Sequence, residues 1–204
     1  MLKWLIKNRL NAFERRFGYD VTYARELLAT DTRAFLHYAR LAGLSGYRRD
    51  VPVDVYYAAK LTAVVAEDCG PCSQLVVAMA LGDGVDPRTV AAVIEGNEEG
   101  TAAENAAENA QSGAVLGEPA RLGVRFARAV LAHDPAADEL REIITRRWGP
   151  RAVVSLAFAI TASRLFPTLK YALGHGKACR RIEVAGELVV PRRAREVAML
   201  QAMS

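Results

Sequence analysis

Hydrophobic residues recur every three or four positions through most of the chain, which is the spacing of one face of an α-helix. Asp31 and Asp86 precede two of these segments as predicted N-caps. The predicted helices cover residues 20–29, 32–44, 52–65, 72–82, 87–95, 101–111, 119–132, 138–148 and 152–165. The last one lies between Pro150 and Pro167 and is the most apolar, so we expect it to be the most buried helix.

One segment, residues 182–190, has the pattern of extended structure. Two short runs rich in β-branched residues flank Ala185 and Gly186, which form a predicted turn. Every other periodic segment is helical. The predicted fold class is therefore all-α.

Residues 1–18 form an additional amphipathic helix with a basic face. Its apolar positions have helical spacing, whereas Lys7 and Arg9 interrupt any continuous apolar run and no small-residue cleavage site follows, so a signal peptide is excluded. Such a helix can lie on a membrane surface, or it can pack on the protein body or on a second subunit. We expect a homo-oligomer with this helix in or beside an interface. The apolar positions are Leu2, Leu5, Ile6, Leu10, Phe13 and Phe17.

Composition restricts the class of protein. The chain has 204 residues, 51% hydrophobic and 25% charged, which is typical of one globular domain. The net charge of +4 is too small to indicate nucleic-acid binding by itself. The longest apolar run, residues 152–163, ends at Arg164 and is too short to cross a bilayer. We expect a cytoplasmic protein.

The candidate chemistry lies at Cys69-Gly70-Pro71-Cys72. At the start of a helix, free N–H groups and the macrodipole favour the thiolate, and two sulfurs one turn apart can close a disulfide. A structural zinc would need further ligands at metal spacing, and neither Cys179 nor the isolated histidines supply them. No metal or cofactor is expected. Two buried, inert cysteines remain the alternative.

Cys-Gly-Pro-Cys is also the thioredoxin tetrapeptide. Thioredoxin requires a strand before the motif and a parallel sheet around it. The residues before Cys69 have helical spacing and much alanine, and no alternating strands surround the site. The motif therefore indicates thiol chemistry without the thioredoxin fold.

The segment around the motif is similar to another family. Residues 54–72, followed by residues 75–86 and 90–96, resemble the carboxymuconolactone decarboxylase superfamily, and within it the alkylhydroperoxidase AhpD-like branch. The similarity covers about residues 50–175. It implies an AhpD-like helical bundle, self-association, and thiol-based reduction of peroxides or disulfides. In this interpretation residues 1–204 form one domain, with residues 1–50 as a helical extension and residues 176–204 as a C-terminal hairpin and tail.

The sequence departs from the AhpD pattern at the groups that handle protons. The family has a Glu twelve residues before the first cysteine, a His just before the second, and a His four residues after it. These positions hold Tyr57, Pro71 and Val76 here. The resemblance carries over only the two cysteines, with Cys72 at the position that attacks peroxide and Cys69 at the resolving position.

Glu67 and Tyr57 are the nearest local substitutes for the missing acid and base. Glu67 is equally explained as a solvated carboxylate at a helix end, and His37 as a packing residue of a separate helix. Glu104 and Glu108, in the Ala-Ala-Glu-Asn repeat, form either a solvated acidic face or carboxylates above the cysteine site.

Three classes of function follow. The first is a thiol oxidoreductase with a reversible Cys69–Cys72 disulfide, served by a thiol or disulfide electron-donor protein. The second is an AhpD-like oligomeric binding or assembly module without activity, and the third is a cofactor-free lyase. Without a general base, disulfide reduction should outperform peroxide reduction. Because Cys69 precedes the helix, we expect it to be the more exposed sulfur that exchanges with outside thiols, with Cys72 nearer the core.

Overall fold

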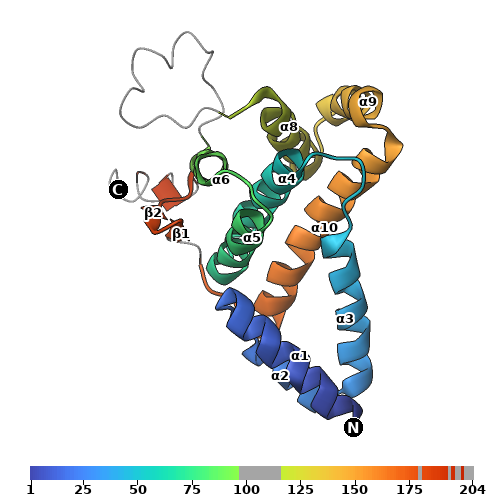
Figure 1. Ribbon diagram of the computed structural model, residues 1–204, viewed down its shortest axis with the longest axis vertical. Helices are drawn as coiled ribbons and strands as arrows, with labels where there is room; N and C mark the ends of the chain where they lie inside the picture. Colours follow the sequence, from blue (N-terminus) through green and yellow to red (C-terminus); the bar gives the residue numbers. More distant parts are fainter. Residues whose placement is uncertain (97–115, 179–180, 193, 196–198, 200–204) are drawn as a thin grey trace.

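The computed structural model describes residues 1–96, 116–178, 181–192, 194–195 and 199. These residues form nine α-helices and one two-stranded hairpin, which confirms the all-α class (Figure 1). The helices are α1 (Leu2–Phe17), α2 (Thr22–Thr30), α3 (Thr32–Gly46), α4 (Val53–Ala66), α5 (Gly70–Gly82), α6 (Pro87–Glu95), α8 (Glu118–Ala132), α9 (Ala136–Trp148) and α10 (Pro150–Ala172). The strands are β1 (Ile182–Val184) and β2 (Glu187–Val189).

Local capping begins helices where the sequence predicts it. The Asp31 carboxylate accepts the Arg33 backbone N–H at the start of α3, and Asp86 does the same for Arg88 at α6. The predicted helix at residues 101–111, with Glu104 and Glu108, lies outside the described residues, as does Cys179.

Helix α10 is longer than the sequence predicts. The expected end before Pro167 is wrong, because α10 continues through this proline to Ala172. Proline removes one backbone hydrogen bond from a helix. Ser163, Pro167 and Lys170 are all buried at helical spacing, so tertiary packing on this face outweighs the lost bond.

The full length of α10 also changes the expectation that no helix is long enough to cross a membrane. Its 23 residues are long and apolar enough to cross a bilayer by length and composition, contrary to the sequence-based expectation. However, α10 packs against α3, α4 and α9, and 44% of its most apolar window is buried inside the protein. These contacts are those of a core helix in a compact helical domain, which fits a soluble protein.

Helix α4 is the centre of the main core. It packs against α5, α6, α8 and α10 (Figure 1). The approach of α8 depends on Gly123, where a Cβ atom would lie 2.6 Å from the Val55 carbonyl oxygen. A side chain at this position would therefore push α8 away from α4.

A second apolar cluster joins the first three helices. Figure 1 shows α1 and α2 together at one end of the molecule, with α3 rising from them. No residue of α1 is fully buried, although one side of the helix packs on this cluster. The buried members are Tyr19, Val21, Tyr23, Ala24, Leu28 and Phe35, and those of α1 packed against them are Ile6, Leu10, Phe13 and Phe17.

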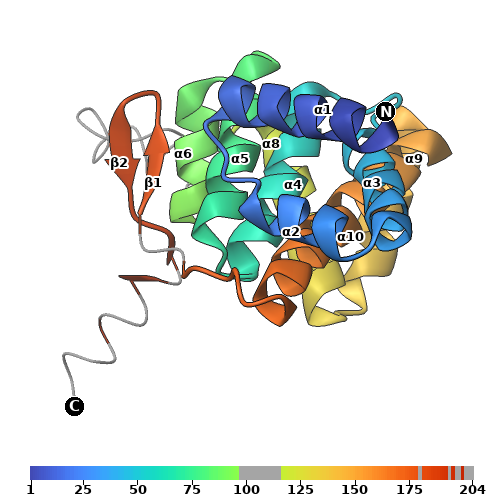
Figure 2. The same ribbon diagram turned by 90° about the horizontal axis from the view of Figure 1, so that it is seen from below.

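The hairpin forms where the sequence predicts it. Ile182 pairs with Val189 in an antiparallel register, and Ala185 and Gly186 adopt positive φ angles of 51° and 90° in the turn. The Gln74 side chain of α5 binds both the N–H and the C=O of Glu183. The hairpin therefore lies beside α5 and α6, on the side away from α3 (Figure 2).

Candidate redox site

The two motif cysteines lie at the start of α5. Cys69 is the N-cap residue and Cys72 lies in the first turn, with their sulfurs 2.6 Å apart. Pro71 occupies a first-turn position, where its missing N–H removes no helical hydrogen bond. Both thiols are free. The arrangement places the two sulfurs within hydrogen-bond distance and on the path to a disulfide.

The expected order of exposure is wrong. Cys69 is 0% exposed and Cys72 is 5% exposed. The end of α10 and the chain after it approach the Cys69 turn. The Tyr171 hydroxyl donates to the Asp68 carbonyl at 3.0 Å, and the Gly70 N–H donates to the Lys177 carbonyl at 3.0 Å. Cys72 instead lines a cavity that is partly open to the surface. A molecule in this cavity therefore meets the sulfur of Cys72.

A tyrosine and a lysine lie beside Cys72. The Tyr19 hydroxyl is 3.8 Å from the Cys72 sulfur, and the Lys170 ammonium donates to the same hydroxyl at 3.3 Å. The Lys170 nitrogen also lies 4.8 Å and 5.0 Å from the ring centroids of Tyr19 and Tyr23. Lys170 is 3% exposed, and no described carboxylate lies within ion-pair distance of it. A thiolate is therefore the natural counter-charge for this buried cation.

The surroundings shift the pKa values of the two thiols in opposite directions. The hydrogen bond with Cys72 lowers the pKa of Cys69 to about 7, and the positive charge of Lys170 acts in the same direction. The hydrogen bond with Cys69, burial and the Cys69 charge raise the pKa of Cys72. Burial raises the pKa of Tyr19, so its hydroxyl remains protonated near neutral pH. The pair thus holds one negative charge and one proton.

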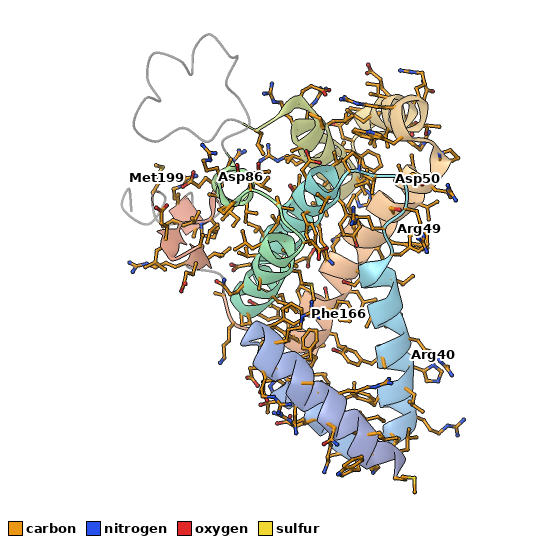
Figure 3. The ribbon with its side chains drawn as sticks, in the orientation of Figure 1. Arg40, Arg49, Asp50, Asp86, Phe166 and Met199 are labelled. Atoms are coloured by element: carbon orange, nitrogen blue, oxygen red, sulfur yellow. The ribbon has the colours of Figure 1, made fainter. Side chains whose placement is uncertain are left out.

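The cavity lies between the two apolar clusters and has a volume of about 610 Å³. This is the size of a typical small-molecule site. Helices α1 to α5 and α10 supply its walls, which are mainly apolar. Figure 3 labels Phe166 on α10, and its ring packs at 5.8 Å against that of Tyr38 on α3. The apolar wall residues include Leu10, Phe13, Leu75, Val76, Met79 and Phe166.

The far end of the cavity contains a second polar group of residues. The Tyr57 hydroxyl donates to the Asp83 carboxylate at 2.8 Å, and the Tyr56 hydroxyl and the Lys60 ammonium both donate to the Ser45 carbonyl. Lys60 is 3% exposed, and burial lowers its pKa to about 8. Each end of the cavity therefore has a buried lysine. Lys170 contacts the lining residue Tyr19, and Lys60 lines the cavity itself.

The structure places some of the predicted site residues at the cavity and others away from it. Cys69, Cys72 and Tyr57 lie in or beside the cavity, but the Tyr57 hydroxyl is bound to Asp83 rather than to a sulfur. Glu67 does not line the cavity, because its carboxylate accepts a 2.8 Å hydrogen bond from Arg164 on α10. His37, expected to pack in its helix, is exposed.

The sequence reasoning missed Tyr19, Lys60 and Lys170. A signal existed for both lysines. Lys60 is the single charged residue between Asp54 and Glu67, and Lys170 continues the buried helical spacing of α10. Tyr19 follows the end of α1 and carries no periodic signal. Its place beside Cys72 results from long-range packing.

The described residues contain no group of three or more His, Cys, Asp or Glu side chains arranged to hold a metal ion. Comparisons with models of protein families, with curated proteins and with solved structures found no match to this chain. The similarity to the carboxymuconolactone decarboxylase superfamily therefore contributes only to the proposal that follows.

Proposed function

We propose that this protein is a thiol oxidoreductase of the AhpD-like type, which reduces hydroperoxides or disulfides by oxidising Cys69 and Cys72 to a disulfide. The observation that carries the proposal is the pair of free sulfurs 2.6 Å apart, one of which lines a cavity of small-molecule size. Buried cysteines without a role need neither a neighbouring sulfur nor an adjacent cation. Here both are present.

The site can balance the protons of hydroperoxide reduction. The pair loses one proton to become a thiolate, and the remaining proton passes between the sulfurs so that Cys72 is the thiolate. Cys72 attacks the terminal oxygen of the hydroperoxide, and the O–O bond breaks. The alkoxide that leaves takes a proton from the Tyr19 hydroxyl, and Lys170 then returns a proton to Tyr19.

The second half of the reaction closes the disulfide. Cys72 now carries a sulfenic acid, and the Cys69 sulfur attacks it, gives up its proton and releases water. The hydroperoxide has gained two electrons and become an alcohol, and the two thiols have lost two electrons. A dithiol or a thiol-bearing donor protein then returns the electrons by exchange at Cys72, the sulfur that lines the cavity.

The assignment of the entry sulfur differs from the sequence-based expectation. Exchange through Cys69 requires an open path to that sulfur, and Cys69 is fully buried. We therefore place attack and partner exchange at Cys72 and resolution at Cys69. This agrees with the roles that the family resemblance implies.

The test is a thiol count before and after addition of one equivalent of hydroperoxide, with Cys179→Ala as the background. The expected result is the loss of two thiols and a Cys69–Cys72 disulfide identified by mass spectrometry. Cys69→Ala should stop at a Cys72 sulfenic acid trapped by dimedone, whereas Cys72→Ala should not react. Full retention of both thiols under these conditions would contradict the proposal.

We also propose that the chain self-associates through α1. Three large apolar side chains of this helix are exposed: Leu2, Trp4 and Leu5 are 53%, 63% and 50% exposed. A cluster of this kind on a surface helix favours contact with another apolar surface. An assembly module without redox activity is the alternative function that this surface supports.

The proposed compartment is the cytoplasm, where a thiol pair remains reduced between turnovers.

A further inference from the structure

The cavity has a polar element that the proposed redox chemistry does not use. Lys60 projects from α4 into its wall, is 3% exposed, and donates one hydrogen bond, to the Ser45 carbonyl at 2.8 Å. An ammonium group has three N–H donors, so two remain free for another acceptor. The nearest acid, Asp83, is bound to the Tyr57 hydroxyl, and no described carboxylate forms an ion pair with Lys60.

Other features of the cavity also favour an anion. Arg48 and Arg9 line the same cavity from exposed positions, and Asp83 is the one acidic residue among the described lining residues. The Lys60 ammonium lies 5.5 Å and 5.8 Å from the ring centroids of Tyr56 and Tyr57. These contacts hold the cation in place but leave its charge unpaired, and a buried charge without a counter-ion is unfavourable.

The length of α5 along the cavity wall limits the length of the ligand. Tyr57 binds Asp83 just after the last turn of α5, whereas Cys72 lies in the first turn. The eleven residue steps from Cys72 to Asp83 correspond to about 16 Å at the helical rise of 1.5 Å per residue, which is the longest stretch of α5 that a ligand can follow. The wall between the two ends is apolar and includes Leu75, Val76 and Met79.

We propose that the cavity binds a long-chain carboxylate, with the carboxylate on Lys60 and the apolar chain along α5 toward Cys72. This inference rests on the proposed function and deepens it, since it makes a fatty-acid hydroperoxide the substrate class. The elongated apolar wall fits the alkyl chain of such a ligand, and the unpaired buried ammonium of Lys60 fits its carboxylate. A small hydroperoxide without a carboxylate would leave Lys60 without a partner.

Binding of unreactive ligands tests this inference separately from the redox chemistry. Decanoate and decanol, which share a chain length, are titrated into the full-length reduced protein by calorimetry. We expect decanoate to bind about tenfold more tightly or better, because a buried charge-assisted hydrogen bond discriminates the two head groups. Equal affinity of the two ligands would overturn the inference, and this arm needs no variant.

Two variants locate the carboxylate. In Lys60→Met the preference for decanoate over decanol should fall close to one, whereas Lys7→Met, which removes an exposed lysine of α1 outside the cavity wall, should keep it. A preference that survives in Lys60→Met would place the carboxylate elsewhere and also overturn the inference.

A third measurement locates the alkyl chain of the ligand. Saturating decanoate should slow alkylation of Cys72 in the wild-type protein, because the chain fills the space beside that sulfur. Unchanged alkylation of Cys72 would contradict the orientation. Failure of the proposed function shows instead as thiols that do not oxidise with hydroperoxide, an outcome that these binding measurements do not depend on.

Discussion

The hydroxyl of Tyr19 lies 3.8 Å from the sulfur of Cys72, although the two residues are 53 positions apart. Tyr19 belongs to the turn between α1 and α2, and Cys72 to the first turn of α5. The contact joins the two apolar clusters at the Cys-x-x-Cys motif. In the proposed mechanism this hydroxyl is the proton donor, at positions where the AhpD pattern has histidines and this chain has none.

Replacing Tyr19 with phenylalanine should separate the two candidate reactions. Loss of a general acid typically slows a reaction by about 10²-fold or more, so hydroperoxide reduction should fall by about this factor. Disulfide exchange should change little, because a thiolate leaving group needs no proton. Initial rates with a hydroperoxide and with an aromatic disulfide measure the two reactions.

Tyr38→Phe is the matched control for this variant. Its hydroxyl lines the same cavity but binds Tyr23 at 2.6 Å. Equal slowing of both reactions in Tyr19→Phe would indicate a packing role for the hydroxyl and remove it from the mechanism.

Replacing Lys170 with methionine should raise the pKa of Cys69, because the variant loses a positive charge that favours the thiolate. The pH midpoint of the ultraviolet absorbance of the thiolate, which needs no reagent to reach the buried sulfur, measures this change. Folding should not suffer, because methionine replaces a buried cation that has no carboxylate partner among the described residues. Lys177→Met, an exposed lysine nearby in the chain, should leave the midpoint unchanged.

Lys60 should make the stability of the protein depend on pH. Its pKa is about 8 in the folded protein and about 10.4 in the unfolded chain. Between these values the unfolded chain binds more protons, so the free energy of unfolding rises with pH, by about 3 kcal/mol over the window. Of the charged groups that face Lys60, Asp83 opposes the shift, and Tyr56 and Tyr57 ionise above this range.

Lys60→Met removes this pH dependence. Denaturation by urea at pH 7, 8, 9 and 10, in a Cys69→Ala/Cys72→Ala background that lacks the two thiols titrating in this range, should show a rising stability for the protein with Lys60 and a nearly flat one for Lys60→Met. At pH 7 the variant should be the more stable protein, since it lacks the penalty of a buried ammonium. A rise that persists in Lys60→Met would assign the effect to another group.

Replacing both Trp4 and Leu5 with glutamate should weaken self-association. The two side chains are exposed and lie off the cavity wall, so the thiol chemistry should be unaffected. Light scattering across the micromolar range measures the mass of the assembly. Val154→Glu, which alters an exposed apolar residue of α10, serves as the control. A wild-type protein that is strictly monomeric over this range would contradict the proposed association.

The sequence by itself determined the helices and the reactive motif. Helical periodicity, the N-caps Asp31 and Asp86 and the turn at Ala185 are local, because each depends on residues within a few positions of one another. The Cys-x-x-Cys spacing is local in the same way, since one helical turn brings the two sulfurs together. These predictions needed no knowledge of how the helices pack.

Only the tertiary structure decided what surrounds the thiols. Burial of Cys69 depends on the end of α10 and the chain after it, and the hydroxyl beside Cys72 comes from the turn before α2. The passage of α10 through Pro167 likewise depends on packing, because local propensity alone would end the helix there. The free energy that brings these distant segments together comes from burying apolar surface, which is non-directional. A pattern along the chain therefore identifies buried faces but not the residues that meet across them.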